Sequence, residues 1–340
     1  MKRSGLRVFG NFWGERSLGY SAGLFRIAYG VLALWTSLGV HLNLQRFYGQ
    51  EGVMPWARVK HFPEHVYSVL SVAPEDGSWL FGVACVFSVA AFFLTIGFVP
   101  RFWSLVIFAI NVALQHRNPY VVNGGDRLFV ILAALGALLP LGHRWSVDAW
   151  IHRKLGREPR QVSVWSQRLI GLQISYIYLF SCFAKLAHAG WWKGNAIYHV
   201  MSSQVFAEWP VEITIPLLVP LATWGTLLFE WLFPLAVWLP RYRPYALVLG
   251  VAFHVGIDVA LVIPMFSAIM VAAYPCYMSD AETVAFVNIL LKPLGRRVTM
   301  EAPAEVSAGG PTQPAEGPNS SGTRSSHPSS SGPSAPGSLA

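Results

Sequence analysis

Residues 79–98 read WLFGVACVFSVAAFFLTIGF, twenty residues without a charged side chain. A helix rises about 1.5 Å per residue, so this run is about 30 Å long, which is the thickness of a bilayer's hydrocarbon core. Seven further apolar runs accompany it: 18–40, 101–116, 127–142, 168–188, 213–239, 244–263 and 265–279. The sequence therefore predicts an all-α fold, a polytopic integral membrane bundle of about eight transmembrane helices.

The composition also indicates a membrane protein. Apolar residues make up 54% of the 340 residues and charged residues only 12%, against roughly 25% charged in an ordinary soluble chain. The net charge of +8 does not indicate a nucleic-acid partner, because the basic residues lie between apolar runs, where membrane topology explains them. We therefore expect membrane lipid as a partner and no nucleic acid. All three cysteines fall within apolar runs, so no disulfide framework is implied.

The distribution of lysine and arginine predicts the orientation, because cytoplasmic loops carry an excess of both. With a cytoplasmic N-terminus, seventeen of the 25 basic residues lie inside and six outside, while Arg26 and Lys185 fall within spans. This asymmetry predicts a multi-pass protein of the cell membrane with both termini in the cytoplasm. The long outer loop 41–78 and the outer segment 189–212 are rich in aromatic residues, so we expect any functional site in the outer half.

Four segments follow from this pattern. Residues 1–17 form a cytoplasmic N-terminal segment, 18–280 the transmembrane domain, and 281–300 a cytoplasmic juxtamembrane segment. In residues 301–340, thirty-one of forty positions are Ala, Gly, Pro, Ser or Thr. This composition has too little apolar bulk to offset chain entropy, which predicts a disordered C-terminal tail.

Ionisable residues inside spans are costly and are usually paired or functional. Arg26 lies about 12 Å and Glu230 about 13 Å from the inner boundary, at about 1.5 Å per residue. Their signs are opposite and their depths match. The sequence therefore predicts a structural ion pair between Arg26 and Glu230.

Lys185 lies about 25 Å up the fifth span, near the outer boundary. One interpretation is an ammonium that extends to the outer headgroups. The other is a neutral amine in a dry, apolar setting that can take a proton as a base. On the seventh span, His254 and Asp258 are four residues apart and share a helix face. The carboxylate could fix the imidazole tautomer, or the two could simply satisfy each other in a helix interface.

A metal site is not expected. The segment from His61 to His65 matches the H-x-x-E-H zinc pattern literally. That pattern needs a helix to bring both histidines onto one face, and Pro63 removes an amide donor in the middle of it. The sequence therefore favours a solvated turn at this place and no metal.

The segment around Lys185 carries further ordered features. Residues 175–180 read SYIYLF, 184–186 read AKL, and 191–196 read WWKGNA. This order resembles the K-L…W-x-x-G-x-A core of the HTTM family, which includes the membrane part of the vitamin K-dependent γ-glutamyl carboxylases and many bacterial relatives. Other similar positions are Arg26-Ile27, Tyr48-Gly49, Gly52–Pro55, Asn123–Asp126, Pro140–Gly142, Ser146–Asp148, Glu230, Phe253–Gly256 and Phe266. The resemblance covers about residues 18–280.

The resemblance implies a membrane enzyme. In the carboxylases the lysine of this core is regarded as the base that starts the oxygenation of reduced vitamin K, after which a glutamate captures carbon dioxide. Carried over, that base is Lys185, and His254 is expected to orient the quinol or an intermediate. Trp191 and Asp258 are the expected cofactor contacts, and the implied cofactor is reduced vitamin K or menaquinol.

Two departures from the carboxylases leave a second hypothesis open. A large soluble lumenal domain follows the spans there, whereas a tail follows them here, and Gly125 stands where a histidine is expected. The first hypothesis is a quinol-dependent oxygenase or carboxylase-like enzyme, a carbon–carbon lyase. The alternative is a non-catalytic membrane component for the maturation, export or immunity of a secreted peptide or protein. An enzyme should lose its function in Lys185→Ala while keeping its fold, and a scaffold should tolerate the change.

Overall fold

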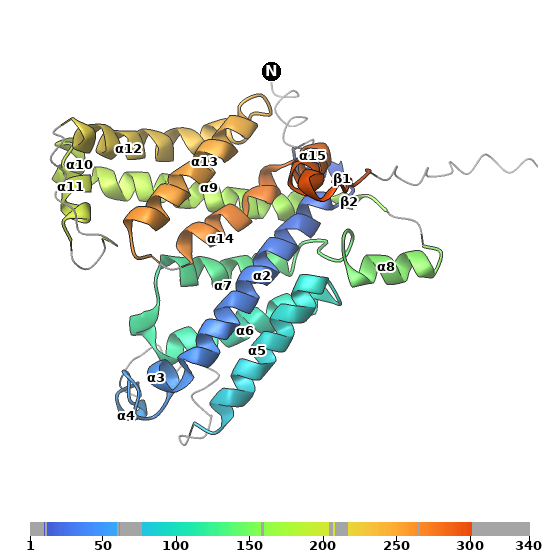
Figure 1. Cartoon of the computed structure of the whole chain (residues 1–340), viewed down its shortest axis with the longest axis horizontal. Coiled ribbons are helices and arrows are strands. Elements are labelled where there is room, and N and C mark those ends of the chain that lie inside the picture. Colours follow the sequence, from blue (N-terminus) through green and yellow to red (C-terminus); the bar gives the residue numbers. More distant parts are fainter. Residues whose placement is uncertain are drawn as a thin grey trace, which may run out of the picture. The chain divides into compact units, whose positions relative to one another are not determined.

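The computed structural model describes residues 10, 12–59, 61, 77–157, 160–203, 207, 217–263 and 265–300, and these are mainly helical, with almost no strand (Figure 1). The predicted tail 301–340 and most of the H-x-x-E-H segment lie outside the described residues. The α-helices are α2 (Tyr20–Leu42), α3 (Leu44–Tyr48), α4 (Trp56–Val59), α5 (Trp79–Ile96), α6 (Pro100–Arg117), α7 (Gly124–Gly136), α8 (Val147–Lys154), α9 (Trp165–Leu186), α10 (Ala189–Trp192), α11 (Ala196–Met201), α12 (Leu218–Ala236), α13 (Arg243–Ala260), α14 (Phe266–Ala272) and α15 (Asp280–Leu291). The 3-10 helices are η3 (Pro119–Val121), η4 (Tyr274–Tyr277) and η5 (Lys292–Leu294), and strands β1 (Arg16–Ser17) and β2 (Val162–Ser163) pair antiparallel.

Five helices are long and apolar enough to cross a membrane: α2, α5, α9, α12 and α13. They confirm the prediction of an all-α, multi-pass membrane protein. The other three expected spans are also helical but shorter or more polar. Helix α7 has 13 residues, α14 has seven, and the last turn of α6 carries the polar run from Gln115 to Arg117. The predicted number of eight spans is therefore approximate.

Helix α2 packs closely on α5 because a glycine lies at the contact. A Cβ at Gly30 would lie 2.5 Å from the Thr95 Oγ1 atom, so only glycine allows this approach. On another side of α2 the rings of Tyr29 and Phe129 stack with centroids 4.8 Å apart, and the Tyr29 hydroxyl donates to the Phe129 carbonyl at 2.8 Å. These contacts join α2, α5 and α7 into one core.

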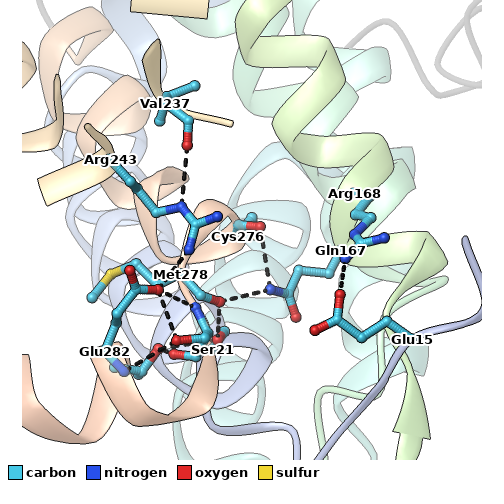
Figure 2. A network of polar contacts seen from close by, with 11 residues as sticks. Glu15, Ser21, Gln167, Arg168, Val237, Arg243, Cys276, Met278 and Glu282 are labelled. Atoms are coloured by element: carbon cyan, nitrogen blue, oxygen red, sulfur yellow. Dashed lines mark hydrogen bonds and ion pairs between the residues drawn. The ribbon is translucent and has the colours of Figure 1, made fainter. Parts of the chain in front are cut away.

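A polar network holds together the ends at which α2, α9, α13 and α15 begin (Figure 2). The Gln167 side-chain amide donates to the carbonyls of Cys276 and Met278, each at 3.2 Å, and Ser21 Oγ donates to the Met278 carbonyl at 2.8 Å. Arg243 contacts Glu282 at 2.7 Å. The network therefore fixes the first turns of helices that come from distant parts of the sequence.

Glu282 titrates within this network. Burial alone would raise the pKa of its carboxyl, but hydrogen bonds from the Ser279 amide and hydroxyl, together with the Arg243 guanidinium, bring that pKa below its ordinary value. The Ser279 hydroxyl in turn accepts from the Glu282 amide at 3.3 Å, which completes a capping box. The charged form of Glu282 is therefore the one that stabilises the start of α15.

Candidate functional site

Helices α9 and α12 run antiparallel, and three contacts establish their alignment. Trp238 Nε1 donates to Ser175 Oγ at 3.1 Å, and Ser181 Oγ donates to Glu230 Oε1 at 3.0 Å. Further along, Cys182 Sγ lies 3.7 Å from the Leu227 carbonyl. Residue numbers rise along α9 as they fall along α12. Ser181 and Glu230 therefore lie at about the same level of the bundle.

Lys185 lies one turn beyond Ser181 and turns back toward it. Its Nζ donates to Ser181 Oγ and to Glu230 Oε1, both at 2.5 Å. Helical side chains lean toward their own helix N-terminus. In antiparallel helices Lys185 and Glu230 therefore lean toward each other. The Lys185 side chain is 23% exposed and that of Glu230 only 6%. The structure thus places the ammonium against a carboxylate inside the bundle rather than extended outward.

The predicted Arg26–Glu230 pair is wrong. Arg26 is fully buried, and its NH2 donates to the Trp145 carbonyl at 2.5 Å, while Glu230 pairs with Lys185. Arg26 instead packs on Gly97, where a Cβ would lie 1.5 Å from the guanidinium NH1.

Depths counted from the two inner helix ends do not match because α9 begins about ten residues before Ser175, which contacts Trp238 just beyond the end of α12. Lys185 also leans back by about 6 Å, about one helical turn.

The structure places Trp191 beside Lys185. Helix α10 folds back over the end of α9, and the Lys185 Nζ lies 5.3 Å from the centroid of the Trp191 ring. Trp192 Nε1 donates to the Leu186 carbonyl at 2.6 Å, and this hydrogen bond fixes α10 against the end of α9. Gly194 has φ +73, and a Cβ there would lie 3.0 Å from the Trp224 ring. The W-x-x-G spacing therefore places an aromatic face beside the lysine.

The other candidate catalytic residue, His254, belongs to a separate buried cluster. His254 is 1% exposed, and its Nε2 lies 2.7 Å from the Tyr178 hydroxyl. That hydroxyl also lies 2.7 Å from the hydroxyl of Tyr274. Tyr178 lies on the same face of α9 as Ser181 and Lys185, about two helical turns below the lysine.

Asp258 does not pair with His254, contrary to expectation. It is exposed near the end of α13 and makes no hydrogen bond or ion pair with any residue that the structure describes. The imidazole leans toward the N-terminus of α13, away from Asp258, and reaches α9 instead. Sharing a helix face was therefore insufficient for contact.

Tyr178, Ser181 and Tyr274 were not predicted from the sequence. A signal for the first two was present, because positions 178, 181 and 185 follow the spacing of one helix face. Tyr274 comes from η4, and only the tertiary fold brings it to α9. In the described part of the chain, no three His, Cys, Asp or Glu residues gather as a ligand set for a metal.

Two buried polar atoms in these clusters have no hydrogen-bond partner among the described residues. They are Glu230 Oε2 and His254 Nδ1. Each is costly in an apolar interior unless something else satisfies it. The two atoms therefore mark places where the bundle can accept a proton or a ligand.

Comparisons with known proteins place this geometry in a family. The model of the HTTM domain matches residues 19–281, a range that contains both clusters. The chain belongs to the HTTM family. This confirms the resemblance drawn from the K-L…W-x-x-G-x-A core.

Two Bacillus subtilis (strain 168) proteins are similar to this HTTM chain. Sporulation-delaying protein SdpB is 28% identical over 209 residues, 57% of this chain and 63% of SdpB. Uncharacterized protein YitO is 26% identical over 211 residues, 58% of this chain and 66% of YitO. Both alignments span just under two thirds of the relatives' own length. No solved structure matches the chain.

Proposed function

We propose that this HTTM protein is a quinol-dependent oxygenase or carboxylase-like enzyme in which Lys185 is the base and Glu230 its proton partner. The observation that carries the proposal is the 2.5 Å contact between Lys185 Nζ and Glu230 Oε1 inside the bundle. Ionisable pairs in membrane helices are costly and usually functional.

The pair gives Lys185 a route to its neutral form. A base must first lose its own proton, and Glu230 Oε1 is in direct reach to take it. Ser181 Oγ, 2.5 Å from Nζ and 3.0 Å from Oε1, holds both groups in place during the exchange. The amine that results can then accept a proton from a substrate hydroxyl.

The residues present fit a reduced quinone such as reduced vitamin K or menaquinol. A quinol has an aromatic body and a hydroxyl, and the Trp191 ring lies beside the partly exposed Lys185 amine. When bound, the quinol supplies the acidic hydroxyl and the electrons that reduce dioxygen. Trp191 would hold the ring, and Lys185 Nζ would take the hydroxyl proton. Asp258, which contacts neither residue in the described chain, is left out of this site.

We further propose that this site faces the outside of the cell membrane and that both termini are cytoplasmic. Basic residues gather at the end where α2 begins: Arg144 Nε donates to the Leu18 carbonyl at 3.0 Å, and Arg168 pairs with Glu15. The positive-inside rule favours this end for the cytoplasm. Lys185, at the opposite end of α9, then faces outward.

Oxygen uptake by the protein in lipid nanodiscs tests the enzyme proposal. Wild type should consume dioxygen when a reduced naphthoquinone is added, and Lys185→Ala should lose about a hundredfold or more, the contribution of a general base. Lys193→Ala is the matched control, because this lysine lies in the same segment but is exposed and should be dispensable. Equal rates in wild type and Lys185→Ala would sink the proposal.

A second candidate follows from the name of SdpB, a sporulation-delaying protein. In this alternative the chain is a non-catalytic component for the maturation, export or immunity of a secreted peptide or protein. Secretion of such a peptide from cells would then depend on the chain but survive Lys185→Ala. A peptide whose maturation fails in Lys185→Ala but not in Lys193→Ala would instead unite the two candidates, with the peptide as a substrate of the enzyme.

A further inference from the structure

Tyr274, Tyr178 and His254 form a hydrogen-bond chain whose direction can be worked out. Each phenol carries one hydrogen, and a neutral imidazole carries one N–H. Tyr178 OH has two partners, each at 2.7 Å: Tyr274 OH and His254 Nε2. Tyr274 OH has no other hydrogen bond with the described residues, and it packs so closely on Gly250 that a Cβ there would lie 2.4 Å away.

One direction satisfies both phenols. If Tyr274 donates to Tyr178 and Tyr178 donates to His254 Nε2, every phenol hydrogen is used. In the opposite direction both the Tyr274 hydrogen and a bare Nδ1 lack a partner among the described residues, whereas the first direction leaves only Nδ1 unmet, and each unmet buried polar group is costly. The first direction makes Nε2 an acceptor. The single imidazole hydrogen then lies on Nδ1.

The Nδ1–H group so placed is buried and has no hydrogen-bond acceptor among the residues that the structure describes. Its surroundings are apolar, since the rings of Phe253 and Phe266 lie with centroids 5.6 Å and 5.8 Å from that of His254. A buried donor among aromatic rings suits one kind of ligand, a neutral oxygen acceptor on an apolar body.

We infer that Tyr178, which accepts a hydrogen bond from Tyr274, is a positioning residue that holds His254 as its Nδ1–H tautomer, so that the imidazole donates a hydrogen bond to a neutral oxygen of an apolar ring ligand inside the bundle. The inference deepens the proposed function by adding a second polar contact in the same bundle. It does not require that Lys185 act as a base.

Nitrogen NMR of the ¹⁵N-histidine-labelled protein in nanodiscs tests the tautomer, because protonated and bare ring nitrogens resonate far apart. Loss of signals in His254→Gln assigns this residue. Wild type should show protonated Nδ1 and bare Nε2. Tyr178→Phe should give a mixture of tautomers, whereas Tyr274→Phe, which leaves the Tyr178 bond to Nε2, should keep the wild-type pattern. Protonated Nε2 in wild type would overturn the inference, even if a tyrosine variant fails to fold.

Two matched probes then test the ligand. Menadione carries neutral carbonyl oxygens on a fused ring, and methylnaphthalene has a similar ring without oxygen. Menadione should shift the Nδ1–H resonance, and its Kd should rise about tenfold in His254→Phe, the loss of one hydrogen bond. Methylnaphthalene should leave the resonance unchanged. If both probes or neither probe shift it, the oxygen contact is refuted. Either result is independent of oxygen uptake and of Lys185.

Discussion

The Lys185–Glu230 pair predicts a strong and asymmetric energetic coupling between α9 and α12. In Lys185→Met, the Glu230 carboxylate keeps Ser181 at Oε1 but has no described partner at Oε2, and its side chain is only 6% exposed. Breaking a buried pair by removing one partner costs about 3–5 kcal/mol, and we expect about 3 kcal/mol here. The reverse change, Glu230→Gln, should cost only about 1–2 kcal/mol, because the more exposed lysine can extend to the headgroups.

The double variant Lys185→Met with Glu230→Gln should recover most of this loss. No uncompensated charge then remains, and Ser181 can still bond to the amide. Reversible unfolding in mixed micelles, followed by the fluorescence of the 14 tryptophans, gives the three free energies of unfolding. Strict additivity of the two single changes would refute the pair as a coupled unit. So would a larger cost for Glu230→Gln than for Lys185→Met.

Three further predictions test other parts of the structure. Because the Glu282 pKa lies below its ordinary value in the folded state, Glu282→Gln should lower the free energy of unfolding by about 0.5–1 kcal/mol at neutral pH. This loss should shrink as the pH falls through the ordinary glutamate pKa and further into the acid range; a constant difference down to acid pH would contradict it. Gly97→Ala should lower the free energy of unfolding by about 3 kcal/mol or more, because the φ of Gly97 is +74 and its Cβ would meet the buried guanidinium of Arg26. The control Gly82→Ala in α5, where a Cβ has open space, should be neutral or stabilising. In a cysteine-free background, an impermeant thiol reagent should label Glu51→Cys in intact cells and Arg153→Cys only after lysis; the reverse pattern would invert the proposed orientation.

The fold was largely predictable from the sequence because bilayer spans are set by length and apolarity. Helices α2, α5, α9, α12 and α13 lie where charge-poor runs predict them. The polar last turn of α6 and the shortness of α7 show the limit of that rule. Such helices are held by packing against their neighbours rather than by hydrophobic length, and packing cannot be read from one segment.

The candidate site was only partly predictable. The proximity of Lys185 and Trp191 is predictable from local spacing, because the two residues are six positions apart across one helix end. The pairing of Lys185 with Glu230 could not be predicted in this way. Depths counted along the chain paired Glu230 with Arg26, because they do not include the offset between the helix ends or the direction in which long side chains lean. Tyr274 could not be found either, since nothing local to η4 indicates a contact with α9.

Chemical rescue tests the central claim, that Lys185 is the base, most directly. Lys185→Ala leaves Glu230 and Trp191 in place and creates room for a small primary amine beside them. If Lys185 takes a proton, added alkylamines should restore quinol-dependent oxygen uptake in this variant, and the rate should rise with amine basicity, as general-base catalysis requires. A rate that no amine restores, in a variant that remains folded and still binds the quinone, would contradict the account.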